Sequence, residues 1–489
     1  MNLTHVAVLL AYVALMLAIG LWFARGKNTS TGEDFVLAGR SLPAWVLGGT
    51  MLATFVGSGS VIGGANFAYT YGLLPGLLFF SGTVVGTFVM VALARRVRVL
   101  STHTIPELFE MRYNRAVRVV GTVIILVAFI GITAYQFTGA GYIFSLITPL
   151  SEDTGAILAA LLITFLAMTG GLKSVAWSDA LSSLLIVFAL WVAVFIVVGV
   201  DVGTDNLGAL GTVGEEGTFG GLTGLQMFSY ILPVFVLLLG DQNMYQRLGA
   251  AKNERAAFTG AMIFAGGSII MVTPVVLLAV SSAVLQPGIE ADLAVLSLSD
   301  QQFTPGLVGG ALLAGAFALI VTTGSSYLLT CSSNIVHDLV GQLRRDNPPS
   351  DRANLWIGRV AVLAIAVLGF VMVNFFPNVL ALQMYAYTMY GAAITPVVLA
   401  AVFWKRATAP GALAGMIAGG VATLAWEITG STDIVQSVMI ALPVAVLTMV
   451  VVSLLTTPDR RSAETLDDAE HAAEEEVRRN RATEAQAND

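Results

Sequence analysis

The sequence predicts an all-α polytopic membrane protein with about 13 transmembrane helices, because of its composition, its length and the distribution of its charges. Hydrophobic residues make up 56% of the 489 residues and charged residues only 11%, and the mean hydropathy is +0.82. Such values are typical of helical membrane proteins rather than soluble enzymes. At roughly 20 apolar residues per crossing plus short loops, the chain has room for about 12 to 14 spans.

The apolar stretches give the positions of these spans along the chain. The first one is long enough to remain as a span, and no basic segment precedes it as in a cleavable signal peptide. The thirteen expected spans are 3–24, 43–70, 73–94, 117–148, 154–170, 177–200, 224–246, 257–285, 306–338, 354–375, 378–404, 411–428 and 434–456.

The basic residues indicate how the spans are oriented. If the N-terminus is outside, all 24 Lys and Arg residues lie on or near the cytoplasmic side, including Arg247 at the end of the seventh span. The opposite loops, 201–221 and 286–305, carry acids and no Lys or Arg. The positive-inside rule therefore predicts a multi-pass protein of the cell membrane, with its N-terminus outside and its C-terminus cytoplasmic.

The chain divides into a transmembrane domain, 1–457, and a charged tail, 458–489. The tail is rich in Asp, Glu, Ala and Arg, and we expect it to be a solvated cytoplasmic extension rather than a nucleic-acid-binding segment. The lipid bilayer and a small molecule are the partners that this organisation predicts.

The second span is interrupted near its middle by small residues. A Gly-Ser-Gly-Ser run occupies 57–60 and a Gly-Gly pair occupies 63–64, and glycine makes local unwinding of a helix inexpensive. Backbone groups freed at membrane depth are tolerated only where protein buries them or where they line a cavity, so the break could hold an ion or a solute. The alternative is a kinked helix that packs closely through its small residues.

The ninth span carries four hydroxyl side chains close together. Thr322, Ser325 and Ser326 lie three and four residues apart and so share one helix face, with Thr323 beside them. Hydroxyl and carbonyl oxygens are the ligands that a small hard cation takes in exchange for water. Alternatively, these hydroxyls bond to their own helix or to a neighbouring one.

An acidic residue, Asp179, lies just inside the sixth span, after a short loop that contains Lys173. A carboxylate at that depth is unfavourable unless a cation pairs with it. Its alternative role is to cap the helix, since acids near a helix N-terminus interact favourably with the macrodipole.

The chain contains no nucleotide-binding, P-loop, HExxH or Cys/His metal motif, and its four His residues are scattered. We therefore expect a transporter rather than an enzyme. A channel and a transporter-like sensor remain as alternatives. A channel would need a continuous polar lining, and the tail carries no recognisable kinase or regulator domain.

Taken together, several motifs resemble those of the sodium/solute symporter family, whose members are sodium-coupled carriers of sugars, proline, pantothenate, iodide and choline. The resemblance covers nearly the whole chain from about 35 to 340. The matching segments are 35–43, 104–109 with the following Arg112-Tyr113, 170–179, Gln246-Arg247 and 322–333.

The resemblance implies a LeuT-type fold, in which two inverted five-helix repeats form the core. Here the repeats correspond approximately to 43–200 and 224–404, and the helices at 3–24, 411–428 and 434–456 are peripheral. The opposite orientations of the second and seventh spans agree with such repeats. The function implied is symport, in which Na+ drives the import of a small polar organic solute by alternating access.

The family's main sodium site uses carbonyls of the first and eighth core helices and two hydroxyls of the eighth. The matching positions are the carbonyls of Ala53, Val56 and Leu319 and the hydroxyls of Thr322 and Thr323. Some members hold a second sodium, and its ligands correspond to Asp179, Thr322, Ser325 and Ser326. This chain has Phe55 where proline carriers of the family have an aspartate, which argues against proline as the solute.

Other polar residues of the core helices are candidates for binding the solute. The Asp241-Gln242 pair resembles the seventh span of sugar and urea carriers, and carboxylates and amides suit the recognition of hydroxyl or N–H groups. Each candidate could equally be a hydrogen-bond partner between helices. The candidates are Ser60, Asn66, Tyr135, Asp241, Gln242 and Gln383. The identity of the solute and the oligomeric state are left open by the sequence.

Overall fold

The computed structural model describes residues 3–24, 38–99, 103–169, 172–214, 217–344, 346–347 and 350–457. Within these ranges the chain is helical, and its only β-type pairing is an isolated bridge between Leu42 and Ala251. The expected C-terminal tail, 458–489, and the Gly170-Gly171 pair lie outside the described residues.

The helices formed by the apolar stretches follow the order of those stretches along the chain. They are α1 (Leu3–Ala24), α3 (Ala44–Phe55), α4 (Gly64–Tyr71), α5 (Leu73–Val99), α7 (Arg115–Ile147), α8 (Glu152–Thr169), α9 (Leu172–Ile196), α10 (Gly224–Gly240), α11 (Gln242–Gly249), α12 (Glu254–Leu285), α13 (Gly306–Ser333), α15 (Asp351–Val373), α16 (Val379–Ala393), α17 (Thr395–Phe403), α18 (Ala409–Ile428) and α19 (Val438–Leu455).

Shorter elements connect these helices. They are η2 (Ala38–Arg40), η3 (Gly59–Gly63), α6 (Ile105–Arg112), η4 (Val197–Gly203), η5 (Thr204–Thr212), η6 (Ala291–Leu293), η7 (Leu296–Ser299), η8 (Asn334–Val340), α14 (Gly341–Leu343) and η9 (Ser431–Asp433). Of these, η3, η4 and η8 are π-helical turns.

Polar N-cap residues define where several helices begin. Asn114, Asn253 and Asn378 each accept a hydrogen bond from an amide in the first turn of α7, α12 and α16. Thr223 forms a capping box with Gln226 at the start of α10. Because such side chains satisfy amides that have no partner within the helix, the sequence places a helix start directly after each of them.

The expected count of thirteen spans is not confirmed. Among the described residues, ten helices are long and apolar enough to cross a membrane, and an eleventh span results if the bent pair α3 and η3–α4 is counted as one. The expected spans 3–24 and 154–170 form α1 and α8, which are helical but are not among these. A multi-pass membrane protein is nevertheless what these ten helices support.

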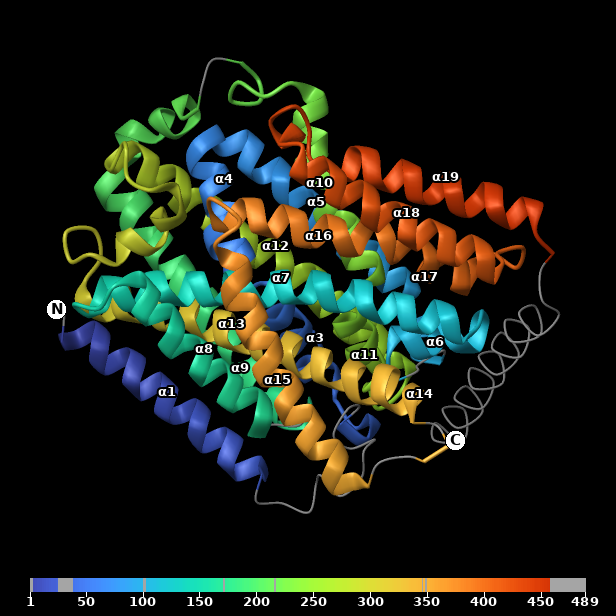
Figure 1. Ribbon diagram of the computed structural model, residues 1–489. Helices are drawn as coiled ribbons and strands as arrows, with labels where there is room; N and C mark the ends of the chain where they lie inside the picture. Colours follow the sequence, from blue (N-terminus) through green and yellow to red (C-terminus); the bar gives the residue numbers. More distant parts are fainter. Residues whose placement is uncertain are drawn as a thin grey trace, which may run out of the picture.

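The helices differ in how deeply they lie in the bundle. In the segment 306–343, which includes α13, 78% of the residues in the most apolar 18-residue stretch are buried. In the segment of α16 and α17 the corresponding share is 89%. It is only 28% for α15 and for α19. Figure 1 agrees, because α1 lies along one edge and α18 and α19 lie side by side along the opposite one. The most buried helices are therefore those expected to carry the hydroxyl cluster and Gln383.

Three of the apolar segments are broken rather than continuous. The expected break in the second span is present, since α3 and η3–α4 are inclined by 58°. The expected spans 224–246 and 378–404 are present as segments long and apolar enough to cross a membrane. Each contains an interruption that the sequence did not predict, because Asp241 leaves the helical conformation between α10 and α11 and Ile394 separates α16 from α17. Pro396, at the start of α17, cannot donate the amide that a continuous helix requires.

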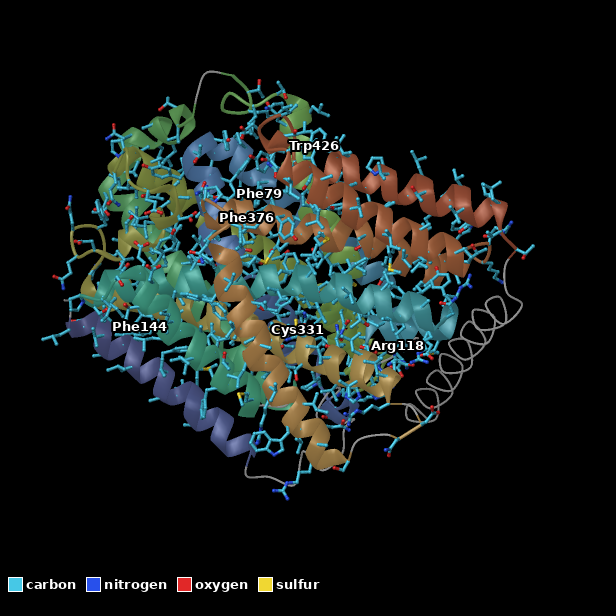
Figure 2. All side chains as sticks on the ribbon, in the orientation of Figure 1. Phe79, Arg118, Phe144, Cys331, Phe376 and Trp426 are labelled. Atoms are coloured by element: carbon cyan, nitrogen blue, oxygen red, sulfur yellow. The ribbon has the colours of Figure 1, made fainter. Side chains whose placement is uncertain are left out.

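The bundle has two ends, which Figure 2 marks by residues of α7. Arg118 lies near one end and Phe144 near the other. The Arg118 end holds an ion-pair cluster in which Arg118 contacts Asp338 and Glu110. The Phe144 end carries the connection between α12 and α13, in which Asp292 is buried.

Candidate ion and solute site

The break in the second span is fixed by contacts with α7. The backbone amide of Ser58 donates to the Gln136 side chain (3.0 Å), and the Ser58 hydroxyl donates to the carbonyl of Tyr135 (2.8 Å). Ser58 and Gln136 are completely buried. In a continuous helix the Ser58 amide would donate to the carbonyl of Thr54. Here the side-chain oxygen of Gln136 accepts that hydrogen bond instead.

The same break releases a backbone carbonyl. In a continuous helix the amide of Ser60 would bond to the carbonyl of Val56, but it bonds instead to the carbonyl of Gly57 (3.1 Å). Val56 itself leaves the helical conformation, with φ −92° and ψ 89°. The Val56 carbonyl is thus removed from the hydrogen-bond ladder at the position where the sequence predicts an ion ligand.

The ninth-span hydroxyls lie against this break. Thr323 donates from Oγ1 to the carbonyl of Ala53 (3.0 Å), and Thr322 donates from Oγ1 to the carbonyl of Leu319 (3.1 Å). Both threonines are 3% exposed or less. The Thr323 bond joins α13 to α3, whereas the Thr322 bond lies within α13. The groups in these two contacts are hydroxyl and carbonyl oxygens, which suit a hard cation such as Na+.

Glycine at position 57 makes this approach possible. A Cβ atom on Gly57 would lie 2.8 Å from Oγ1 of Thr323 and 3.0 Å from both terminal atoms of Gln136. A larger residue would force one of these polar groups to move. Gly57 therefore joins the predicted ion site to the contacts that hold the break.

Of the residues predicted for a second sodium, some make contacts between helices and others bond within their own helix. Asp179 is fully buried and accepts at Oδ2 from the hydroxyls of Thr50 (2.7 Å) and Thr54 (3.3 Å) on α3. Ser325 donates to the carbonyl of Thr322 (3.1 Å) on its own helix. Asp179 is the eighth residue of α9, beyond the first turn in which a helix cap or the macrodipole acts most strongly.

Asp179 and Ser326 both contact the guanidinium group of Arg247. Nη2 of Arg247 lies 3.6 Å from Oδ2 of Asp179 and 3.0 Å from the Ser326 hydroxyl. Nε donates to the Thr50 hydroxyl (3.1 Å). Arg247 is 1% exposed and lies buried between α3, α9 and α13, an environment that the sequence did not predict for it.

Three of the solute candidates gather around η3. A Cβ atom on Gly59 would lie 2.9 Å from Cδ of Gln383 and 3.2 Å from the hydroxyl of Tyr387. Tyr135 donates to that same hydroxyl (3.4 Å), and Ser60 is part of η3 itself. Nε2 of Gln136 and Oε1 of Gln383 are buried and have no hydrogen-bond partner among the described residues. Such unpartnered polar atoms suit contact with a bound solute.

Asp241 and Gln242 lie at the second break, where their polar groups are paired within the protein. Asp241 accepts from the Tyr327 hydroxyl (2.7 Å), and the Gln242 side chain donates to Asn334 (2.7 Å). The Tyr390 hydroxyl accepts from the Gln242 amide (3.1 Å) and donates to the carbonyl of Gly240 (2.7 Å). These bonds satisfy backbone groups that the break would otherwise leave without partners.

Asn66 has a different environment from the other candidates. Its side chain donates to Asp292 (2.7 Å), which lies in η6 at the Phe144 end. Asp292 also accepts from the Tyr142 hydroxyl (3.3 Å) and from the amide of Val379 (3.0 Å). Asn66 thus belongs to a cluster that joins α4, α7 and α16 to the α12–α13 connection.

Several residues of the site were not predicted. Thr50 and Thr54 lie one turn apart on α3, and only their position opposite Asp179 reveals their role. The sequence indicated a role for Arg247 in the site only weakly, because this residue ends an apolar span shortly after the acidic Asp241. It did not indicate a role for Asp292, since acids are common in connecting loops.

Comparison with solved structures gives the fold. The chain is similar to a Na+-coupled sialic acid symporter in its substrate-bound outward-open state, with a TM-score of 0.75 and 18% identity over 93% of this chain and 98% of that one. The expected LeuT-type fold is therefore supported.

Sequence comparison then gives the family. The chain belongs to the sodium:solute symporter family, whose model matches residues 35–419. It is 27% identical to the sodium/proline symporter of Haemophilus influenzae, over 95% of this chain and 97% of the relative. It is 26% identical to the sodium/pantothenate symporter of Escherichia coli, over 90% and 95%. The family consists of transporters rather than enzymes, and its coupling ion is Na+.

Proposed function

We propose that this protein imports a small polar organic solute together with Na+, and that the main sodium site consists of the carbonyls of Ala53, Val56 and Leu319 and the hydroxyls of Thr322 and Thr323. The observation that carries this proposal is the contact between Thr323 on α13 and the carbonyl of Ala53 beside the break in the second span. It makes one oxygen cluster from two helices, so that a change in their relative position would open or close the ion site.

Alternating access is supported by where the helices break. The proposed repeats, approximately 43–200 and 224–404, each begin with a broken helix: α3 with η3–α4 in the first, and α10 with α11 in the second. Discontinuous helices at corresponding positions of inverted repeats are typical of binding sites at mid-membrane. In the orientation we propose, the Arg118 end is cytoplasmic, in agreement with the positive-inside rule, and the N-terminus is outside.

The solute is proposed to lie beside η3, in contact with Ser60, Tyr135 and Gln383. These side chains offer hydroxyl and amide groups, which recognise a polar solute by hydrogen bonds rather than by a full opposite charge. Relatives carry proline and pantothenate. The side chain of Phe55, which replaces the aspartate of proline carriers, packs edge-on against Phe264 at 6.0 Å, and we therefore propose a solute other than proline.

A second sodium ion is proposed at Asp179, with Ser325, Ser326 and Thr322 as further ligands. The orphan oxygen Oδ1 of Asp179, which is buried and has no hydrogen-bond partner among the described residues, supports a cation at this position. Such an ion would be transported with the solute and not retained.

Sodium-dependent uptake into proteoliposomes tests the main site. Thr322→Ala or Thr323→Ala removes an oxygen that replaces water around the ion, so apparent sodium affinity is expected to fall at least several-fold while the protein still inserts. Thr323→Ser keeps the hydroxyl and is expected to retain most of the affinity. Unchanged sodium dependence in both alanine variants would refute the site, and uptake that neither saturates nor depends on sodium would favour a channel.

A further inference from the structure

The strongest feature beyond the proposed transport cycle is a fully buried arginine at the proposed second sodium site. Arg247 and Asp179 are 1% and 0% exposed. Burying either charge alone would be unfavourable, whereas a pair that is also hydrogen-bonded is tolerated. Thr50 strengthens the link, because it accepts from Nε of Arg247 and donates to Oδ2 of Asp179.

Arg247 also hydrogen-bonds to the Ser326 hydroxyl, which is one of the proposed ligands of the ion. Nη2 donates to Ser326 (3.0 Å), and Nη1 donates to the carbonyl of Asn243 (3.3 Å). One cationic group therefore contacts both Asp179 and Ser326, which are two of the four proposed ligands. Placing Na+ on the same two residues would bring a second positive charge against the guanidinium in a site of low dielectric, where repulsion is strong.

We propose that Arg247 competes with Na+ for Asp179 and Ser326, and that it serves as the internal cation of this site when the carrier holds no ion. This inference rests on the proposed function, because it assumes that a second sodium binds at Asp179. A symporter must return empty after it releases its cargo, and a bare carboxylate in the membrane core would oppose that step. Arg247 neutralises the carboxylate in the ion-free protein and withdraws when sodium enters.

The position of Arg247 suits such an exchange. It lies near the end of α11, the short helix that follows the break at Asp241. Asp179 and Ser326 lie within the long helices α9 and α13. A small movement of α11 relative to these helices would withdraw the guanidinium without moving the ligands themselves.

The test is a sodium titration of the purified full-length protein, in which choline replaces sodium at constant ionic strength and thermal stability is the readout. Arg247→Gln is expected to be less stable than the native protein without sodium, to gain more stability from sodium, and to show an apparent sodium affinity about tenfold higher, within the usual range of coupling between sites. The double variant Asp179→Asn with Arg247→Gln removes both charges and is expected to lose this gain.

Two further variants make the test decisive. Arg112→Gln removes another arginine that is 1% exposed but bonds to the carbonyls of Trp404 and Lys405, so it is expected to lower stability without raising sodium affinity. If Arg247→Gln does not fold, Arg247→Lys replaces it, since an ammonium group cannot reproduce the forked contacts of a guanidinium, and a smaller gain in affinity is expected.

Sodium affinity that is unchanged or weaker in the Arg247 variant, or a gain that persists in the double variant, would overturn the competition. These outcomes differ from failure of the proposed function itself. In that case the native protein, too, would show no stabilisation by sodium.

Discussion

Gly57 shows how one residue can connect the ion site to the fold. Its lack of a side chain allows Oγ1 of Thr323 and the end of Gln136 to approach the same point on the broken helix. Gln136 in turn holds the Ser58 amide that the helix has released. A change at Gly57 therefore acts on the ion ligands and on the break together.

Gly57→Ala is expected to lower apparent sodium affinity several-fold, because the new Cβ would press on Oγ1 of Thr323 and disturb its bond to Ala53. Sodium titration of transport or of thermal stability measures this effect. Gly266→Ala is the matched control, since nothing lies within 4 Å of a Cβ at that position of α12 and alanine is the better helix former. Equal sodium affinity in the two variants would show that the approach at Gly57 is not required.

At the scale of an element, the π-helical turn η3 depends on glycines that face α16. A Cβ on Gly63 would collide with Oε1 of Gln383, and one on Gly59 would meet Gln383 and Tyr387. The small residues thus allow close packing and also give access to a candidate solute ligand. If the break binds a solute or an ion, a larger residue in place of one of these glycines would abolish transport. If the glycines serve only close helix packing, transport would be retained.

Gly59→Val or Gly63→Val is expected to abolish solute transport without preventing expression, because the damage is confined to the break. Uptake assays and the yield of folded protein measure the two effects separately. Variants that transport normally would support the alternative in which the glycines serve only helix packing.

In the α12–α13 connection, one residue, Asp292, is expected to make stability depend on pH. Burial raises the pKa of Asp292, although its bonds to Val379, Asn66 and Tyr142 act in the opposite direction. The folded, bonded arrangement therefore binds the proton more tightly than an arrangement in which Asp292 is hydrated. It follows that the contribution of Asp292 to stability is complete below its ordinary pKa and is lost as pH rises through the raised value.

Thermal stability measured as a function of pH tests this expectation. The difference between the native protein and Asp292→Asn is expected to change across the acidic range, with the native protein losing stability relative to the variant as pH rises. A difference in stability that does not depend on pH would contradict a raised pKa of Asp292 in the folded protein.

At the scale of the whole molecule, the number of sodium ions per solute distinguishes the roles of Asp179. If it binds a second ion, the native protein is expected to show a Hill coefficient for sodium above one. Asp179→Asn should lower this coefficient toward one while retaining transport at high sodium. If Asp179 serves only as the partner of Arg247, the variant should lose stability and keep the native sodium dependence.

Reversal potentials in proteoliposomes provide the corresponding measurement on the native protein, because each coupled charge contributes about 2.3 kcal/mol per 100 mV of membrane potential. We expect two sodium ions per solute. A ratio of one to one would rule out the second ion and leave the main site unaffected.

The sequence by itself determined the membrane class, the break in the second span and the family resemblance, since these depend on composition, local helix propensity and short motifs. It did not predict the break at Asp241, which contains no glycine-rich run. There the hydroxyl groups of Tyr327 and Tyr390 donate hydrogen bonds to the Asp241 side chain and to the carbonyl of Gly240. A short stretch of sequence predicts a structural feature only where residues within that stretch cause it.

The tertiary structure alone decided which buried charges are partners. Asp179 was predicted to need a cation, but the sequence did not indicate that Arg247 would provide it, and the two meet between α3, α9 and α13. Asn66 likewise pairs with Asp292 from a distant connection. The physical reason is that desolvation makes an unpaired buried charge or amide unfavourable, whereas helix packing, which no single segment specifies, determines which partner is within reach.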